Sequence, residues 1–234
     1  WWVNSNETNY SPPNRDKFTF GFWTPWWHYN DFEGNNSQSE GFTGVTDSTG
    51  THFLRLDFGE EGTTRPTSIT AEATVMDLNR QAWTSGTSVL VHPADVYVGL
   101  RSERYFVERG EPLEIELIVT DLEGNAVEGR PVTVEAARIV WKSAGGWHEE
   151  LLDPQTCEVT STLDPLTCTF ETFVGGRYRI TALVTDEQGR KNESRITRWV
   201  SGGERPPSRE VEQEEITLIP DKDEYQPGDV AEIL

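Results

Sequence analysis

Apolar and polar side chains alternate over most of the second half of the chain. Six segments place an apolar residue at every second position, with Glu, Thr or Arg between: 95–102, 112–121, 130–142, 167–173, 177–186 and 194–200. Gly, Asp and Asn gather between these segments, as at 121–125, 144–146 and 175–176. Six to seven strands in about 105 residues, with no helical period, are predicted. We therefore expect an all-β protein built from antiparallel β-sandwiches of immunoglobulin or fibronectin type.

The strand pattern occurs more than once. Residues 68–91 and 178–200 share an Ala-x-Val-x-Asp sequence followed by an arginine, and each closes on a valine fourteen residues after the aspartate. The matched residues are Ala73, Val75, Asp77, Arg80 and Val91 in one segment, and Ala182, Val184, Asp186, Arg190 and Val200 in the other. A start signal also repeats, because Tyr105, Gly110, Glu111 and Ile115 match Tyr225, Gly228, Asp229 and Ile233. Repetition at both strand starts and strand ends predicts tandem units.

The repeat divides the chain into four parts. We expect an aromatic-rich N-terminal segment plus the end of one sandwich over 1–92, and a complete sandwich over 96–200. A linker rich in Gly, Pro and charge follows at 201–215, and 216–234 forms the first strand of a further unit. Because the chain begins without Met and its last strand has barely begun, we expect a fragment of a longer protein.

Composition narrows the classes of partner. Twenty basic against forty acidic residues give a formal charge of −20, which repels phosphate backbones and anionic lipid surfaces. No run approaches the ~18 consecutive apolar residues of a membrane helix. We therefore expect no nucleic-acid binding and no membrane contact from this part of the protein.

The two cysteines flank a polar segment with Asp164-Pro165 at its turn, the spacing of two strands joined by a loop. A disulfide between Cys157 and Cys168 is one reading, and two unpaired thiols are the other. The disulfide would place the protein in an oxidising compartment, which is extracellular, periplasmic or at the cell surface. Four N-x-[ST] triplets, at Asn6, Asn9, Asn35 and Asn192, agree with secretion only weakly.

Tryptophan and tyrosine cluster near the N-terminus, where Trp23, Trp26, Trp27 and Tyr29 stand within seven positions. Exposed aromatic rings can stack on sugars, so one hypothesis is a carbohydrate-binding face. The simpler alternative is an aromatic-rich loop that packs against the first sandwich or a neighbouring domain.

Signatures of common catalytic and metal sites are missing. His28, His52, His92 and His148 stand singly, and His148 lacks the second histidine of an H-E-x-x-H zinc motif. Neither a nucleophile elbow nor a phosphate-binding glycine loop occurs. We expect no enzyme activity, no cofactor and no metal.

Three stretches, 91–142, 176–202 and 216–234, together resemble the macroglobulin domains of the α2-macroglobulin family, most of all its bacterial members. The last stretch, with Tyr225-x-Pro227-Gly228-Asp229-x-Ala231, resembles the opening of the family's bait-region domain. The resemblance extends from about residue 50 to the end and is poor over the tryptophan-rich beginning.

The resemblance implies a protein that inhibits endopeptidases: a protease cuts a bait segment, and the molecule rearranges and traps it. Partners would be proteases, through the full-length protein, and neighbouring macroglobulin domains of the same chain. Cys157 is followed by Glu-Val-Thr and Cys168 by Thr-Phe-Glu, so neither matches the family's Cys-x-Glu-Gln thioester. The function implied for these residues is a scaffold. The alternatives are a structural or adhesive array of sandwiches at the cell surface and a carbohydrate-binding module.

Overall fold

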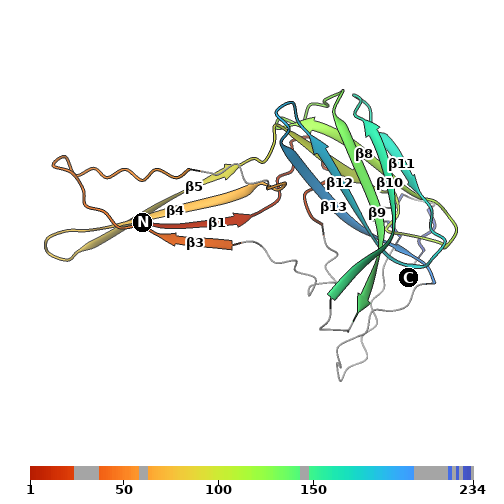
Figure 1. The fold of residues 1–234 in the computed structure, drawn as a ribbon, viewed down its shortest axis with the longest axis horizontal. Coiled ribbons are helices and arrows are strands. Elements are labelled where there is room, and N and C mark those ends of the chain that lie inside the picture. The colour runs from red at the N-terminus through yellow and green to blue at the C-terminus, as the bar shows by residue number, and fades with distance from the viewer. Residues whose placement is uncertain are drawn as a thin grey trace, which may run out of the picture.

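The structure is a computed structural model that describes residues 1–23, 37–57, 63–142, 148–202, 221–222, 225–226 and 229–232. Within these ranges every regular element is a β-strand. Two of the three sheets face each other in a sandwich, and the third extends to one side of it (Figure 1).

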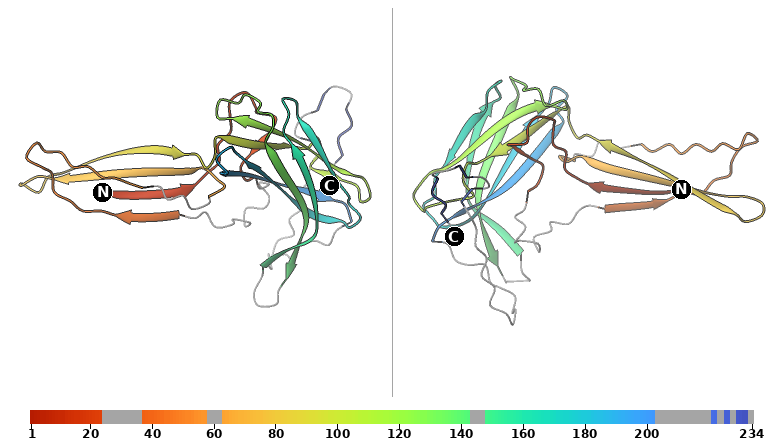
Figure 2. Two further views of the ribbon diagram at one scale, coloured as in Figure 1. Left: turned by 45° about the horizontal axis from the view of Figure 1, so that its top comes forward. Right: turned by 180° about the vertical axis from the view of Figure 1, so that it is seen from behind.

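One layer of the sandwich is a five-stranded sheet in the order β10-β9-β12-β13-β7. Its strands are β10 (His148–Thr160), β9 (Pro131–Lys142), β12 (Gly176–Thr185), β13 (Lys191–Val200) and β7 (Phe106–Val107). The other layer has the order β11-β8-β6-β2. Its strands are β11 (Leu166–Phe170), β8 (Leu113–Asp121), β6 (Val96–Arg101) and β2 (Thr19–Phe20). All pairs are antiparallel except β13 with β7. Figure 2 shows the sandwich and the third sheet from two further directions.

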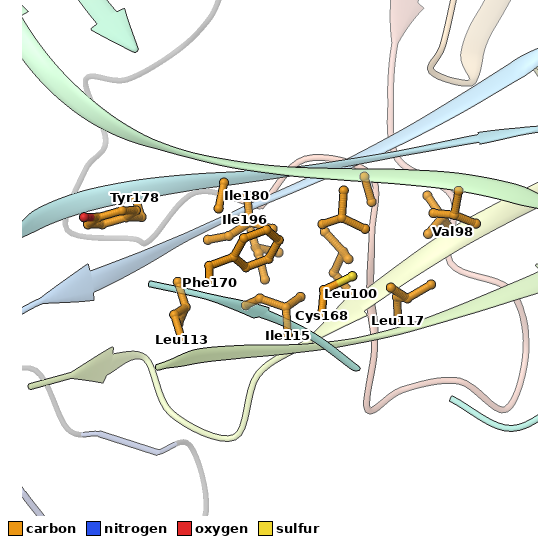
Figure 3. Packing of buried hydrophobic residues seen from close by; sticks show 14 of the residues in the cluster. Val98, Leu100, Leu113, Ile115, Leu117, Cys168, Phe170, Tyr178, Ile180 and Ile196 are labelled. Carbon is orange, nitrogen blue, oxygen red and sulfur yellow. The ribbon is translucent and has the colours of Figure 1, made fainter. Parts of the chain in front are cut away.

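The core lies between these two layers and follows from the alternation. In β13, buried residues alternate with half-buried ones along nearly the whole strand, so one face points inward. Phe170 packs among Ile115, Ile180 and Ile196 from both layers (Figure 3). Each such side chain, fully removed from water, contributes about 1.5–3 kcal/mol before entropy is counted. This continuous core makes the sandwich the stable centre of the molecule.

The third sheet has the order β3-β1-β4-β5. Its strands are β3 (Ser37–Gly41), β1 (Trp2–Glu7), β4 (Thr67–Met76) and β5 (Ala82–Val91). The hairpin β4–β5 pairs Thr67 with Val91, and β12–β13 pairs Gly176 with Val200, so the two repeated sequence segments form matching hairpins. Among the apolar residues described in this sheet, only Val3 and Ile69 are buried.

Residues 8–23 leave the third sheet, add β2 to the edge of one layer of the sandwich and cover the outer face of that layer. Phe18 and Phe20 pack against Gly99 of β6, where an added Cβ would stand 2.6 Å from the Phe20 ring. Glycine is needed at position 99 because the aromatic rings approach the strand so closely. Tyr97 and Ile118, which point away from the main core, are buried beneath this segment. One sheet of the sandwich is therefore covered on both faces.

Four turns share one construction. In each, an aspartate accepts a hydrogen bond at its side chain from the backbone N–H four residues later, at 2.8–2.9 Å. The fourth residue of each turn has a positive φ, between 63° and 85°. The turns begin at Asp47, Asp77, Asp121 and Asp186, and their fourth residues are Gly50, Arg80, Gly124 and Gly189. The turns at Asp77 and Asp186 join the paired strands β4–β5 and β12–β13, so an Asx-type turn closed by a left-handed residue forms both of these hairpins.

The predicted fold class is confirmed: the described residues form antiparallel sheets, two of them packed as an immunoglobulin-like sandwich. Strand β2, from the aromatic-rich N-terminal segment, pairs with β6 and so is part of this sandwich.

Candidate functional site at the two ends of the sandwich

The C-terminal segment docks on the sandwich beside β7. The backbone N–H of Tyr105 donates to the carbonyl of Asp221 at 2.8 Å, and the N–H of Trp199 donates to the carbonyl of Tyr105 at 2.9 Å. The Arg104 guanidinium pairs with Glu232 and lies 3.7 Å from the Asp221 carboxylate. We call Arg104, Tyr105, Asp221, Tyr225 and Glu232 the C-terminal socket.

Asp221 lies at the centre of the socket, and its side chain is only 3% exposed. The carboxylate accepts hydrogen bonds from the Tyr225 hydroxyl at 2.6 Å and from the Glu232 N–H at 2.9 Å. Burial by itself raises the pKa of Asp221, but these hydrogen bonds and the positive charge of Arg104 outweigh it, and the pKa lies below its ordinary value. The socket therefore holds a charged carboxylate at neutral pH.

Trp23 lies against the same corner of the sandwich. Its ring stacks on that of Tyr105, with centroids 5.6 Å apart and planes 8° from parallel, and the Arg198 guanidinium lies over both rings. One face of Trp23 is thus occupied by a contact within the protein. Trp26, Trp27 and Tyr29, the other predicted members of an aromatic binding surface, lie outside the described residues.

A second junction joins the third sheet to the sandwich. The Phe22 ring lies between two guanidinium groups, those of Arg65 and Arg195, each 4.2 Å from its centroid. Arg65 also pairs with Glu7 at 2.9 Å. Phe22 itself forms a β-bridge with Arg195 of β13. The junction therefore connects β1, the chain entering β4, and β13 through one aromatic ring.

Buried polar groups of β13 reinforce this junction. The Asn192 side chain accepts from the N–H of Val98 at 3.0 Å and donates to the carbonyl of Thr64 at 3.3 Å. Ser194 donates to the Val98 carbonyl at 2.6 Å and accepts from the Gly21 N–H at 2.8 Å. Asn192 is fully buried, so this N-x-[ST] triplet is not accessible to a glycosylating enzyme in the folded chain.

Cys157 and Cys168 form a disulfide with a Cα–Cα distance of 6.1 Å. Cys157 belongs to β10, at the edge of one layer, and Cys168 belongs to β11, at the edge of the other. The bond therefore closes the sandwich along its open edge.

Nothing in the described ranges gathers three or more His, Cys, Asp or Glu side chains as a metal site would. His92 lies near the third sheet's connection to β6, with its Nδ1 2.8 Å from the Tyr97 hydroxyl, and burial lowers its pKa. The part of the chain that the structure describes also holds no helix long and apolar enough to cross a membrane.

Sequence reasoning missed the residues that build the two junctions. Arg65 and Arg195 both follow Phe22 in the chain by more than forty residues, and Arg104 is separated from Asp221 by more than a hundred residues. Spacing along a strand cannot reveal such pairs. The repeat of Tyr105 as Tyr225 was the one available signal, and both residues lie in the socket.

Comparison with known proteins supplies a family context for this arrangement. A curated relative, the alpha-2-macroglobulin homolog of Nostoc sp., is 24% identical over 251 aligned residues, covering 100% of this chain and 12% of the relative. The circularly permutated Ras protein 2 of Dictyostelium discoideum is 25% identical over 134 residues, covering 53% of this chain and 3% of that protein. No family model matches the sequence.

Among solved structures, the native conformation of Escherichia coli alpha-2-macroglobulin matches 99% of this chain with a TM-score of 0.52 and 17% identity. That match covers 16% of the E. coli chain and supports the fold. The resemblance to bacterial α2-macroglobulins, predicted from the sequence, is confirmed, and the chain spans about an eighth of the curated relative's length.

Proposed function

We propose that residues 1–234 are scaffold domains of an α2-macroglobulin-like endopeptidase inhibitor, starting from their whole-length similarity to bacterial α2-macroglobulins. In this role the residues perform no chemistry. They hold the next unit of the chain in a defined position and pass on its displacement when a protease cuts the bait segment.

The observation that supports this role is the C-terminal socket. The resemblance assigns residues 216–234 to the opening of the bait-region domain. Asp221 and Glu232 tie that segment to Arg104 and Tyr105 on the sandwich through a buried carboxylate and an ion pair. A displacement of the bait-region domain would therefore act first on the edge of the sandwich that β7 and β13 form.

Location and partners follow from the same proposal. The disulfide between Cys157 and Cys168 favours an extracellular, periplasmic or cell-surface site. The partners of the complete protein would be endopeptidases and its own neighbouring macroglobulin domains. A formal charge of −20 is unfavourable for nucleic-acid binding.

The test uses the longest natural product of the same gene, incubated with trypsin. Trapping predicts that hydrolysis of casein falls while hydrolysis of a small chromogenic peptide persists, because a cage excludes proteins but admits small molecules. Residues 1–234 alone, as the matched control, should leave both activities unchanged. Equal loss of both activities would indicate a blocked active site, and no loss of either would favour a structural or adhesive array.

A further inference from the structure

Three aromatic side chains meet where the third sheet joins the sandwich. Tyr10 follows β1, His92 follows β5, and Tyr97 belongs to β6. The His92 ring is nearly perpendicular to both tyrosine rings, with centroids 4.8 Å from Tyr10 and 5.7 Å from Tyr97. We call these residues the Tyr-His-Tyr cluster. Because two connections between the third sheet and the sandwich pass through the cluster, its contacts help to hold the two parts together.

The two tyrosines attach the cluster to the sandwich. Tyr97 is 1% exposed and lies between β6 and residues 8–23. The Tyr10 hydroxyl donates to the carbonyl of Leu122, in the turn after β8, at 2.7 Å. The two tyrosine rings also contact each other, with centroids 5.3 Å apart. His92 is the member that comes directly from a strand of the third sheet, so it connects that sheet to the two anchored tyrosines.

The hydrogen bond between His92 and Tyr97 has a defined direction. The imidazole Nδ1 and the phenol oxygen are 2.8 Å apart. Burial raises the pKa of Tyr97 well above its ordinary value, so the phenol keeps its hydrogen. In the part of the chain that the structure describes, His92 is the one hydrogen-bond partner of this hydroxyl. The hydroxyl therefore donates, and the neutral imidazole accepts at Nδ1 and carries its own hydrogen on Nε2.

Protonation of His92 is incompatible with this bond. Both nitrogens of an imidazolium are donors, so Nδ1 would direct a hydrogen at the Tyr97 hydroxyl. The buried hydroxyl would then lose its acceptor, which is unfavourable. The positive charge would also lie among aromatic rings instead of in water. Both effects favour the neutral imidazole while the cluster is closed.

Charged groups on the elements around His92 are held by other partners or are exposed. They are Asp95 and Asp186, which pair with Arg190; Glu7, which pairs with Arg65; Asp121, which accepts from Asn125; Arg15, which donates to the carbonyl of Gly124; and the exposed Glu123. The titratable groups in direct contact with His92 are Tyr10 and Tyr97. Burial therefore dominates, and it lowers the pKa of His92.

We propose that His92 is an acid-sensitive contact between the third sheet and the sandwich, which holds the two parts together when its imidazole is neutral and weakens when the imidazole is protonated. Docking is then strongest above about pH 6.5, the ordinary pKa of histidine. It weakens as pH falls from there, until His92 is protonated in the closed cluster as well. This role of His92 does not depend on protease trapping.

The test measures amide hydrogen exchange of residues 1–234 between pH 7.5 and 5.0, expressed as protection factors so that the intrinsic pH dependence of exchange cancels. The reporter is the Glu193 amide, which donates to the carbonyl of Thr64 at 3.0 Å and so joins the sandwich to the chain entering β4. Amides of β12, inside the sandwich, are the internal reference. A parallel NMR titration of the imidazole gives the pKa of His92.

Protection at Glu193 should fall as pH decreases, while protection in β12 stays constant. The fold-loss should equal the ratio of the acid dissociation constants of His92 in the closed cluster and of a free histidine, because the two equilibria are linked. Asp186 and Asp221 do not contribute in this range, since their pKa values lie below the ordinary value of about 4.

Two variants separate His92 from other causes. His92→Gln keeps an acceptor for the Tyr97 hydroxyl and does not titrate, so protection at Glu193 should become independent of pH. Tyr97→Phe removes the hydroxyl that loses its acceptor, so the fold-loss should be smaller than in the native protein. His148→Gln, at the start of β10, is the matched control and should behave as the native protein does.

Three results would overturn the proposal. One is constant protection at Glu193 while His92 titrates, or the same loss in His92→Gln. Another is an equal loss in β12, which would assign the acid effect to unfolding of the whole sandwich. The third is a pKa of His92 at or above 6.5, which would mean that the aromatic rings stabilise the imidazolium.

Discussion

At the residue scale, the aspartate turns show how one side chain can fix the geometry of a turn. Asp186 gives the strongest example, because its side chain is 2% exposed. It accepts hydrogen bonds from the N–H groups of Gln188 and Arg190 at 2.9 Å and from that of Asp95 at 3.2 Å. The turn between β12 and β13 is thereby tied to the start of β6, in the opposite layer.

Asp186→Asn should lower the free energy of unfolding of the sandwich by about 1–2 kcal/mol at neutral pH, because a charged acceptor is lost. Burial by itself raises the pKa of Asp186, but hydrogen bonds from Arg190, Asp95 and Gln188 outweigh it and leave the pKa below its ordinary value. The carboxylate therefore stabilises the fold fully above its unfolded pKa of about 4, and this contribution is lost as pH falls through the lower folded pKa. Urea denaturation across pH 2–7 should show the two proteins converging in acid.

The matched control is Asp47→Asn, in the same kind of turn at an exposed position outside the sandwich. It should leave the unfolding of the sandwich unchanged. An equal effect of both substitutions would contradict the role assigned to Asp186.

Arg80 breaks the rule that the fourth turn residue is glycine, with a φ of 63°. Because side chains are strained in this region, Arg80→Gly should stabilise the β4–β5 hairpin by up to about 1 kcal/mol. The converse change, Gly189→Ala, should cost about 1 kcal/mol, and its added Cβ meets no atom within 4 Å, so only the backbone is strained. Amide hydrogen exchange across each hairpin measures both effects. Exchange should become slower in Arg80→Gly and faster in Gly189→Ala, and a change in the same direction in both variants would contradict the prediction.

At the scale of elements, the alternation predicted most strands correctly because sheet pairing with one buried face imposes a period of two. The repeated segments became the matching hairpins β4–β5 and β12–β13. Strands β2 and β7 are two residues long and show no alternation of their own. They form only because β6 and β13 offer unpaired edges, which no local pattern reports.

The disulfide acts on two elements at once, because β10 and β11 are edge strands of different layers. Replacing both cysteines by alanine should reduce the free energy of unfolding by roughly 3 kcal/mol. The disulfide closes a short loop and so lowers the conformational entropy of the unfolded chain, and the variant regains that entropy. Urea midpoints of the variant and of the reduced native protein should agree. A variant as stable as the oxidised protein would show that the bond adds nothing to the fold.

At the scale of the whole molecule, contacts between distant parts of the chain set how the units are joined. Phe22 between Arg65 and Arg195 connects the third sheet to the sandwich, and Asp221 connects the sandwich to the C-terminal segment. Each link buries a charged group beside hydrogen-bond donors or an aromatic face. The strength of each link therefore depends on the relative positions of these groups and not only on the buried surface area.

Asp221→Asn should loosen the C-terminal segment, because an amide cannot match the charge of Arg104 or accept as strongly from Tyr225 and Glu232. Amide exchange at Glu232 should become at least about tenfold faster. Docking of the native protein should weaken in the same way as pH falls below about 4, through the lowered pKa of Asp221.

Tyr225→Phe is the graded control, since it removes one donor and leaves the carboxylate charged. The amide exchange rate at Glu232 in Tyr225→Phe should lie between the rates in the native protein and in Asp221→Asn. Unchanged exchange at Glu232 in both variants would rule out the socket as the attachment point.

Alternation, turn chemistry and repeated segments are local features of the chain, so the fold class, the repeat and the resemblance to α2-macroglobulins could all be inferred from the sequence. The tertiary structure alone decided which residues connect the units. Phe22, Arg65, Arg104 and Arg195 look like ordinary surface residues in sequence, and their role arises when strands far apart along the chain become neighbours. The Tyr-His-Tyr cluster was likewise hidden, because alternation predicts that a strand has an apolar side and cannot say which side chains from other parts of the chain will meet it.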